Sequence, residues 1–195
     1  MNTSHKRALR IILITGASGV GKSVLTKGML RSLTGAKFLT LVTTRSAREG
    51  DPLGEYEYVT KREFEAALTR EEFFVHTRFS RNYYGMRKAT IKAALKRKSF
   101  SIRPTTPGNI PLWWGHLGKQ GAFLHIAPPP ELEIRRRLIT RGSSVREIAR
   151  RIREARNWEK QIAGFIRDGI PIRIITGRNR AAKLDNALRI IRIVP

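Results

Sequence analysis

The sequence predicts an α/β fold with a mostly parallel β-sheet. Short apolar runs rich in β-branched residues alternate along the chain with segments whose apolar residues recur at helical spacing. Parallel strands are buried on both faces and need crossover helices, so both features are those of βαβ units. The chain has 195 residues, of which 41% are hydrophobic, and one domain of this size can bury a core of its own.

In the first half of the chain, apolar runs predict buried strands over residues 10–15 and 38–43. Between them, residues 21–34 have the apolar spacing of a helix. In residues 55–59, Glu alternates with Tyr up to Val59, which predicts a more exposed strand. The pattern Thr60-x-x-Glu63 follows and is a capping box, so it indicates the start of a short helix.

The second half continues the same order. Strand-like runs cover residues 73–77, 99–103, 122–126 and 172–176. Helical spacing covers residues 86–98, 130–140, 145–165 and 181–193. Gly142 lies in the break between two of these helices, and the pair Trp113-Trp114 is expected to pack a loop against the core.

The charge of the chain is strongly positive and unevenly placed. There are 39 Lys and Arg residues against 15 Asp and Glu, a net charge of +24, and the stretch 73–130 contains no carboxylate. Such a balance points to anionic partners, which are phosphates, nucleotides or nucleic acid. Chemistry within that stretch has no carboxylate to serve as a general base or a metal ligand.

Other classes of protein are excluded or disfavoured by composition. The chain has no cysteine, which excludes a disulfide scaffold, a zinc finger and a cysteine nucleophile. No apolar run approaches the roughly 20 residues that a membrane-spanning helix needs. Residues 1–9 are polar and basic and have no long apolar segment behind them. We therefore expect no membrane partner and a cytoplasmic protein.

A phosphate-binding motif follows the first predicted strand. Gly16-Ala17-Ser18-Gly19-Val20-Gly21-Lys22-Ser23 matches the P-loop pattern G-x-x-x-x-G-K-[ST], between a strand and a helix as the motif requires. Its glycines let successive backbone N–H groups turn toward a phosphate, and the helix after it presents its positive end. Lys22 is expected to reach the β- and γ-phosphates, and Ser23 to place its hydroxyl on Mg²⁺.

Several further motifs follow the P-loop. They are Thr43-Thr44-Arg45-Ser46-Ala47-Arg48-Glu49-Gly50, Gly54-Glu55-Tyr56-Glu57-Tyr58-Val59, Glu63-Phe64-Glu65, Asn82-Tyr83-Tyr84-Gly85, Ile126-Ala127-Pro128-Pro129-Pro130, Arg137-Leu138 and Arg141-Gly142. With the P-loop they extend over about residues 13–151, and together they resemble the guanylate kinase family. The resemblance implies a single domain over residues 1–195 with the P-loop NTPase fold. Its parts would be a five-stranded parallel core (9–43, 86–130 and 160–195), a nucleoside monophosphate lobe (44–85) and a helical lid (131–159).

The resemblance also implies roles for individual residues. Arg45, Arg48, Tyr56 and Tyr84 would hold the acceptor phosphate, with Tyr56 aligned by deleting one residue after Gly54. Arginines and tyrosine hydroxyls are suitable donors for a phosphate. The catalytic set would be Lys22, Arg45, Arg137, Arg141 and Arg151, in which the lid arginines neutralise charge on the transferring phosphoryl group. The cofactors would be ATP and Mg²⁺.

The sequence departs from the family where the family reads guanine. Leu41 stands at a Ser position, Val75 at a Glu position and Met86 at a hydroxyl position, and Arg103-Pro104-Thr105 replaces Asp-x-Asp. Each charge-assisted hydrogen bond contributes roughly 1.5–3 kcal/mol. Losing two costs about 3–6 kcal/mol, on the order of two to four decades in affinity. The same Asp pair normally orients Mg²⁺. Here either Ser23 and the phosphates hold the metal, or Glu49, Asp51 or Glu72 replaces the pair, or catalysis is slow or absent.

Three functions therefore remain open. The leading one is an ATP-dependent kinase that phosphorylates a nucleoside monophosphate, nominally GMP to GDP. The second keeps the fold and takes a different phosphorylated small-molecule acceptor, such as ribose 1,5-bisphosphate. The third is a weakly active or non-catalytic relative that binds nucleic acid through the basic surplus, for which Arg135-Arg136-Arg137 and Arg150-Arg151-x-Arg153 are candidate contacts.

Overall fold

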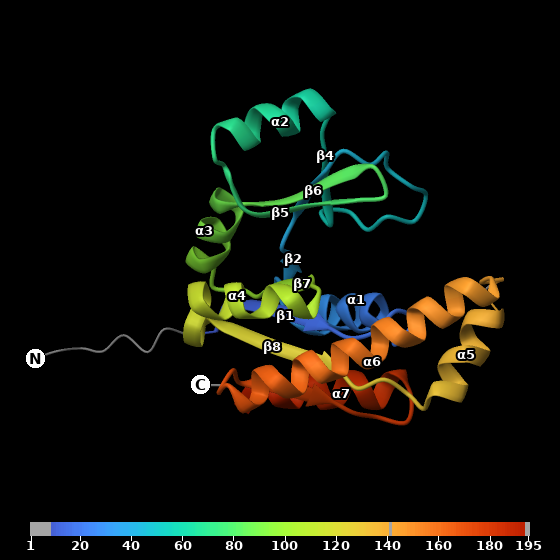
Figure 1. Cartoon of the computed structure of the whole chain (residues 1–195). Helices are drawn as coiled ribbons and strands as arrows, with labels where there is room; N and C mark the ends of the chain where they lie inside the picture. Colours follow the sequence, from blue (N-terminus) through green and yellow to red (C-terminus); the bar gives the residue numbers. More distant parts are fainter. Residues whose placement is uncertain (1–8, 141, 194–195) are drawn as a thin grey trace, which may run out of the picture.

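The computed structural model describes residues 9–140 and 142–193 (Figure 1). The strands are β1 (Ile11–Thr15), β2 (Lys37–Phe38), β3 (Leu41–Thr43), β4 (Tyr56–Tyr58), β5 (Phe73–Phe79), β6 (Asn82–Arg87), β7 (Ser101–Pro104), β8 (Gly121–Ile126) and β9 (Ile172–Ile175). The helices are α1 (Lys22–Ser32), α2 (Lys61–Thr69), α3 (Lys88–Lys96), α4 (Ile110–Leu117), α5 (Glu131–Thr140), α6 (Val145–Arg167) and α7 (Arg180–Ile193). Short 3-10 turns, η1 (Pro107–Asn109) and η2 (Gly118–Gln120), flank α4.

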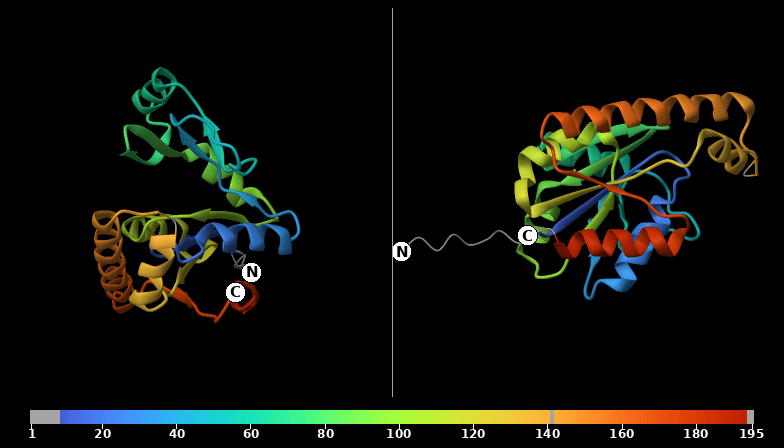
Figure 2. Two further views of the ribbon diagram at one scale, coloured as in Figure 1. Left: turned by 90° about the vertical axis from the view of Figure 1, so that its right-hand side faces the viewer. Right: turned by 90° about the horizontal axis from the view of Figure 1, so that it is seen from below.

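The core of the molecule is a parallel sheet of five strands in the order β2-β7-β1-β8-β9. Its central strand β1 is buried throughout, since Ile12 and Ile14 face one hydrophobic cluster while Ile11 and Leu13 face another. The first cluster includes residues of α1 and α7, and the second includes residues of α3, α4 and α6. Figure 2 shows α6 and α7 on opposite sides of this sheet. The predicted α/β fold with a five-stranded parallel sheet is confirmed.

A second sheet of four strands lies over one end of the core, in the order β4-β3-β6-β5 (Figures 1 and 2). Helix α2 covers it, and the predicted capping box at Thr60 and Glu63 begins this helix. Phe64 of α2 is fully buried, and its ring stacks on Phe73 at 4.4 Å and on Tyr83 at 5.2 Å between centroids. This small aromatic core holds α2 on the sheet, and we call the sheet with α2 the acceptor lobe.

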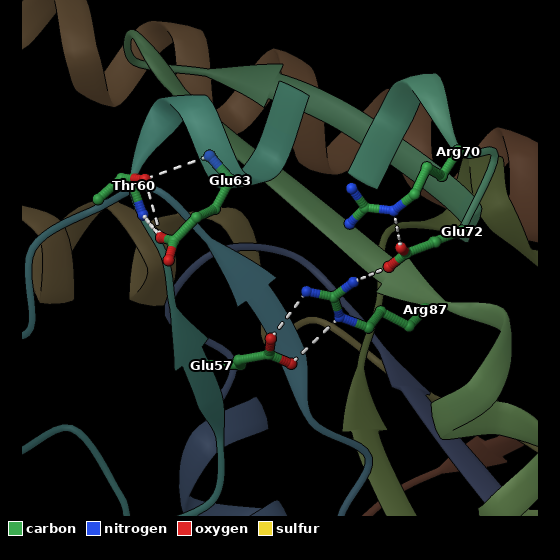
Figure 3. A network of polar contacts seen from close by, with 6 residues as sticks. All are labelled: Glu57, Thr60, Glu63, Arg70, Glu72 and Arg87. Carbon is green, nitrogen blue, oxygen red and sulfur yellow. Dashed lines mark hydrogen bonds and ion pairs between the residues drawn. The ribbon is translucent and has the colours of Figure 1, made fainter. Parts of the chain in front are cut away.

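A network of ion pairs ties the strands of the acceptor lobe together where β6 meets α3 (Figure 3). Arg87, the last residue of β6, contacts Glu57 of β4 at 2.9 Å and also contacts Glu72 before β5. Glu72 in turn pairs with Arg70 at the end of α2, at 2.6 Å. One guanidinium thus joins residues from three segments of the lobe, at the point where the chain leaves it.

Three predicted segments differ from the structure. The run 38–43 is not one buried strand, because β2 pairs with β7 of the core while β3 pairs with β4 and β6 of the lobe. The predicted helix over 86–98 begins only at Lys88, since the two residues before it end β6, a strand that the sequence did not predict. The pair Trp113-Trp114 lies in α4 rather than in a loop, although Trp113 does pack in the core as expected.

Helices α5 and α6 extend from the other end of the core (Figure 1). Ile134 and Leu138 of α5 pack against Ile148 and Ile152 of α6. Between the two helices, Gly142 has a φ of 74°, a left-handed conformation that suits glycine. Within the described part of the chain, no helix combines the length and the apolar character that crossing a membrane would require.

Candidate active site

The phosphate loop connects β1 to α1, and its backbone adopts positive φ angles that favour glycine. Gly16, Gly19 and Gly21 have φ values of 145°, 82° and 105°. At Gly16 a β-carbon would lie 3.0 Å from the carbonyl oxygen of Ile126 on β8, so a side chain is excluded by space as well. No side chain of the described residues caps α1 at Gly21. The first N–H groups of α1 and its positive dipole end are therefore suited to a phosphate.

Lys22 lies over this loop and is largely removed from water. Its Nζ donates hydrogen bonds to the carbonyl oxygens of Gly16 (2.6 Å) and Ala17 (3.0 Å) and lies 5.6 Å from the centre of the Trp158 ring. Burial lowers the pKa of Lys22 to about 8, with an opposing effect of Glu154 and a smaller lowering by Arg151. The ammonium group is thus poorly solvated and lacks an ion-pair partner among the described residues.

Helix α6 passes over the phosphate loop and is fixed there by two contacts. Arg151 donates a hydrogen bond to the Ser18 hydroxyl and is held by Glu147 at 2.7 Å. About two turns further along α6 from Arg151, Glu159 lies 2.7 Å from Nε2 of His125, a fully buried residue of β8. Burial lowers the pKa of His125, and the opposing effect of Glu159 only partly offsets this lowering. A neutral His125 can donate its Nε2 proton to Glu159, and so attaches the helix to the sheet.

A large cavity of about 840 Å³ opens on one side of the phosphate loop. Its lining comes from the loop, α1, α5, the turn before α7 and the first turn of α7: Gly19, Val20, Gly21, Val24, Leu25, Arg136, Arg137, Thr140, Arg178, Asn179, Arg180, Ala181 and Lys183. Arg137 is held by Glu133 at 2.7 Å. We call this the donor cavity. Arg141, another of the three predicted lid arginines, lies outside the described residues.

A second cavity of about 390 Å³ lies between the phosphate loop and the acceptor lobe. Arg45, Arg48, Tyr56 and Tyr84, which the resemblance assigned to the acceptor phosphate, all line it together with Ser23 of the phosphate loop. The remaining lining residues are Lys27, Gly50, Asp51, Pro52, Glu55, Phe79, Ser80 and Asn82. We call this the acceptor cavity. The structure therefore brings together residues that are separated by more than 60 positions in the sequence.

Asp51 organises the donors of the acceptor cavity. Its Oδ2 accepts hydrogen bonds from the backbone N–H of Arg48 (2.8 Å) and the Tyr58 hydroxyl (2.6 Å), and it pairs with Arg45 at 2.9 Å. Hydrogen bonding from Arg45, then from Tyr58, holds the pKa of Asp51 well below its usual range. Arg45 is only 9% exposed, so its guanidinium is presented in one fixed position.

A stack of charged and aromatic groups continues from Arg45 into the core. The guanidinium carbons of Arg45 and Arg103 each lie 4.9 Å from the centre of the Tyr56 ring. Arg103 is 7% exposed and donates to the carbonyl oxygen of Glu55 at 2.8 Å, so it joins β7 of the core to the acceptor lobe. Burial lowers the pKa of Arg103, but an arginine remains charged in a protein.

Three of the positions that depart from the family's guanine contacts lie in apolar surroundings. Met86 is buried in the core, and Val75 and Leu41 pack against the same hydrophobic cluster. Thr105 continues the sheet by donating its backbone N–H to the carbonyl oxygen of Ile14 at 2.8 Å. Among these four side chains only that of Thr105 carries a polar group.

The residues around the phosphate loop fit a magnesium ion that is held mainly by nucleotide and water. Ser23 is exposed at the start of α1 and lines the acceptor cavity. Within residues 9–140 and 142–193, no cluster of three or more His, Asp and Glu residues has the geometry of a metal site. Of the carboxylates considered as substitutes, Asp51 pairs with Arg45, and Glu72 pairs with Arg70 and Arg87. Mg²⁺ commonly keeps several waters and binds through few protein groups and the substrate phosphates.

Sequence reasoning predicted Arg151 but missed the residues around it and several others of this site. Glu147, Arg151 and Trp158 share a face of α6, and their spacing of four and seven residues is a helical signal that could have identified Trp158. Asp51 follows directly after the Arg48-Glu49-Gly50 motif and could have been assigned to its turn. The contact between His125 and Glu159 joins residues 34 positions apart and has no local signal.

Comparison with known proteins identifies the family. The family model described as guanylate kinase matches residues 8–165. The chain is 31% identical to a guanylate kinase of Clostridium perfringens (strain SM101 / Type A), over 75% of this chain and 68% of the relative. It is 30% identical to a guanylate kinase of Ruegeria pomeroyi, over 80% of this chain and 74% of the relative. The crystal structure of a guanylate kinase from Anaplasma phagocytophilum superposes with a TM-score of 0.66, covering 95% of this chain and 85% of that one at 18% identity. The chain therefore belongs to the guanylate kinase family, a family of nucleoside monophosphate kinases with the P-loop NTPase fold.

Proposed function

We propose that the protein transfers the γ-phosphate of ATP to the phosphate of GMP, forming GDP and ADP. The observation that supports this most directly is the position of the phosphate loop. Gly19, Val20 and Gly21 line the donor cavity, while Ser23 lines the acceptor cavity. A phosphoryl group bound at the loop would thus lie between a donor in one cavity and an acceptor in the other.

On the donor side, the loop from Gly16 to Ser23 would bind the phosphates of ATP. The uncapped start of α1 supplies backbone N–H groups and the helix dipole. Lys22, which binds carbonyl oxygens of the loop in the free protein, would turn to the β- and γ-phosphates. Ser23 would hold Mg²⁺, which when bound neutralises charge on the β- and γ-phosphate oxygens.

On the acceptor side, Arg45 and Arg48 would bind the phosphate of GMP, with Tyr56 and Tyr84 as neutral donors. Asp51 fixes the guanidinium of Arg45 and the backbone of Arg48 before the acceptor arrives. Because few side chains then need to be ordered, more of the binding energy appears as affinity.

Catalysis would come from positioning and electrostatics, without a covalent enzyme intermediate. Phosphoryl transfer proceeds through a transition state in which charge spreads over the transferred group. Arg137, Arg141 and Arg151 would approach that group from the lid, and Arg45 from the acceptor side. Arg151 already reaches the phosphate loop through Ser18, and Arg137 lines the donor cavity.

The test is a coupled assay that measures ADP formation with GMP, dGMP, AMP, UMP, CMP and dTMP as acceptors. We expect turnover with GMP, and we expect the variant Lys22→Met to lose it. Absence of turnover with every nucleotide would contradict the proposal. A sugar phosphate such as ribose 1,5-bisphosphate belongs in the same assay as a comparison, although no relative described above is named for such an acceptor.

A further inference from the structure

Helices α3 and α4 lie at the end of the molecule away from α5 (Figure 1). Residues of both helices line a basic groove. It has a volume of about 440 Å³ and is lined by Phe74, Lys88, Ile91, Lys92, Leu95, Lys96 and His116. None of these residues lines the donor cavity or the acceptor cavity. We call this surface the α3–α4 groove.

One edge of the groove is a row of lysines. Lys88, Lys92 and Lys96 are four residues apart on α3, so they share one face and follow one another at a rise of about 6 Å. All three side chains are exposed. None of them takes part in an ion pair among residues 9–140 and 142–193. The row is thus an uncompensated line of positive charge.

The surroundings of the row lack the negative charge that usually accompanies surface lysines. The groove is formed entirely by residues of the stretch 73–130, which contains no Asp or Glu. The nearest carboxylate before this stretch, Glu72, is already occupied by Arg70 and Arg87. A ligand that binds here must therefore bring its own negative charge.

The floor of the groove is aromatic and apolar. The ring of Phe74 is half-buried and lies 4.6 Å from the ring of His116 and 4.9 Å from that of Trp113. Ile91 and Leu95 lie beside it on α3. The groove is therefore a basic edge next to an aromatic platform, the combination on which unpaired bases stack while their phosphates bind lysine.

We propose that the α3–α4 groove binds single-stranded nucleic acid, with successive phosphates on Lys88, Lys92 and Lys96 and a base against Phe74 and His116. A duplex keeps its bases stacked inside and would use only the lysines. A membrane surface would need exposed apolar side chains to insert, and none of the exposed large hydrophobic residues of the described chain lines the groove. An acidic peptide would satisfy the lysines but would leave the aromatic floor without a planar partner.

The experiment measures binding of a short fluorescent oligothymidylate to the full chain by anisotropy, as a function of salt. For single strands, log K falls with log salt at a slope of about −0.7 for each phosphate contact. Replacing all three lysines by Gln should therefore make the slope less negative by about 2. At 50 mM salt the same change should weaken binding by about a hundredfold or more. The matched control is Arg31→Gln, Arg189→Gln and Arg192→Gln, which removes the same charge from exposed positions of α1 and α7.

A second variant tests the aromatic floor. Phe74→Leu should weaken binding about tenfold while leaving the salt slope unchanged, because it removes stacking and no phosphate contact. Thermal unfolding of each variant checks that the fold is kept. The GMP kinase assay is run on the same samples, so loss of nucleic-acid binding with retained kinase activity separates this inference from the proposed function.

Three results would overturn the proposal. The first is an equal loss of affinity in the lysine variant and in the control variant, which would mean that only net charge matters. The second is a duplex of the same length that binds as tightly as the single strand. The third is Phe74→Leu binding as the parent does. Preferential binding of a poly-glutamate peptide over the oligothymidylate would likewise overturn it and assign the groove to an acidic protein.

Discussion

Binding of ATP is expected to take up a proton at alkaline pH, because Lys22 has a pKa of about 8 in the free protein. The amine is removed from water, and its hydrogen-bond partners are the carbonyl oxygens of Gly16 and Ala17 rather than a carboxylate. The phosphates of ATP would supply the missing negative charge. The pKa of Lys22 in the complex should then return to its ordinary value or rise above it.

The size of the effect follows from this pKa. With a pKa of about 8, the free protein lacks about 0.1 proton on Lys22 at pH 7, about 0.5 at pH 8 and about 0.9 at pH 9. Binding should take up these amounts, and the affinity for ATP should fall about tenfold between pH 7 and pH 9. The ionisation of ATP itself does not interfere in the upper part of this range, where its phosphates are already fully ionised.

The same shift affects stability with a definite sign. The pKa of Lys22 is lower in the folded chain (about 8) than in the unfolded chain (10.5), so the unfolded chain binds more protons between these values. The contribution of Lys22 to the free energy of unfolding should therefore increase as the pH rises from about 8 to about 10.5. Below pH 8 the charged, buried amine costs roughly 3 kcal/mol, from 1.36 kcal/mol per pKa unit.

Isothermal titration calorimetry of ATP in two buffers of different ionisation enthalpy measures the proton uptake directly. Uptake that rises from pH 7 to pH 9 is the expected result, and the variant Lys22→Met should show none in whatever binding it retains. A buffer-independent binding enthalpy at pH 8 and pH 9 would refute the reasoning, because it would mean that ATP binding leaves the protonation of Lys22 unchanged.

Two further predictions concern the acceptor lobe. Phe64→Ala removes the buried ring that stacks on Phe73 and on Tyr83. Urea unfolding should show that it lowers the free energy of unfolding by about 3–5 kcal/mol. Because the change lies in the acceptor lobe, the KM for GMP should rise while the affinity for ATP is kept. Gly85→Ala places a β-carbon 2.6 Å from the Phe73 ring and should cost about 1–3 kcal/mol. Gly108→Ala, where nothing lies within 4 Å, is its control and should have little effect on the melting temperature.

Much of the core could be predicted from the sequence because its signals are local. The continuous apolar run of β1 and the glycine pattern of the phosphate loop each depend on neighbouring residues. The capping box at Thr60 also acts within one turn, and it appears in the structure as expected. In such segments, propensity, pattern and turn chemistry agree, so a short window of sequence is sufficient.

The acceptor lobe was predicted less well because its short strands are decided by pairing with distant segments. β6 (Asn82–Arg87) has no regular alternation of polar and apolar residues and becomes a strand through pairing with β3 and β5. Strand propensity depends strongly on such partners. Helix α4 was missed because Pro111 and Gly115 resemble loop residues, although a proline in the first turn of a helix is compatible with it.

The candidate site could be predicted as a set of residues but not as an arrangement. The resemblance identified Arg45 and Tyr56, and the structure places both at the acceptor cavity. The contacts of Arg45 and Arg103 with the Tyr56 ring depend on how β7 of the core meets β4 of the lobe, which no local pattern encodes. Arg103 itself stood out in the sequence only as a replacement for a carboxylate.

The replacement of carboxylates by Arg103 and apolar side chains determines how selective the acceptor site can be. A site that hydrogen-bonds a substrate group rejects analogues by about 10⁴–10⁵, whereas an apolar pocket discriminates by only about 10–200. Since Leu41, Val75 and Met86 pack in or against the hydrophobic core, base selection should fall in the lower range. These changes leave the phosphate contacts in place, so most of the affinity for GMP should come from its phosphate. Guanosine, which has no phosphate, should therefore not bind detectably. We therefore expect kcat/KM values for GMP and AMP to differ by less than about 200-fold. A preference for GMP of 10⁴ or more would mean that polar groups not identified above read the base.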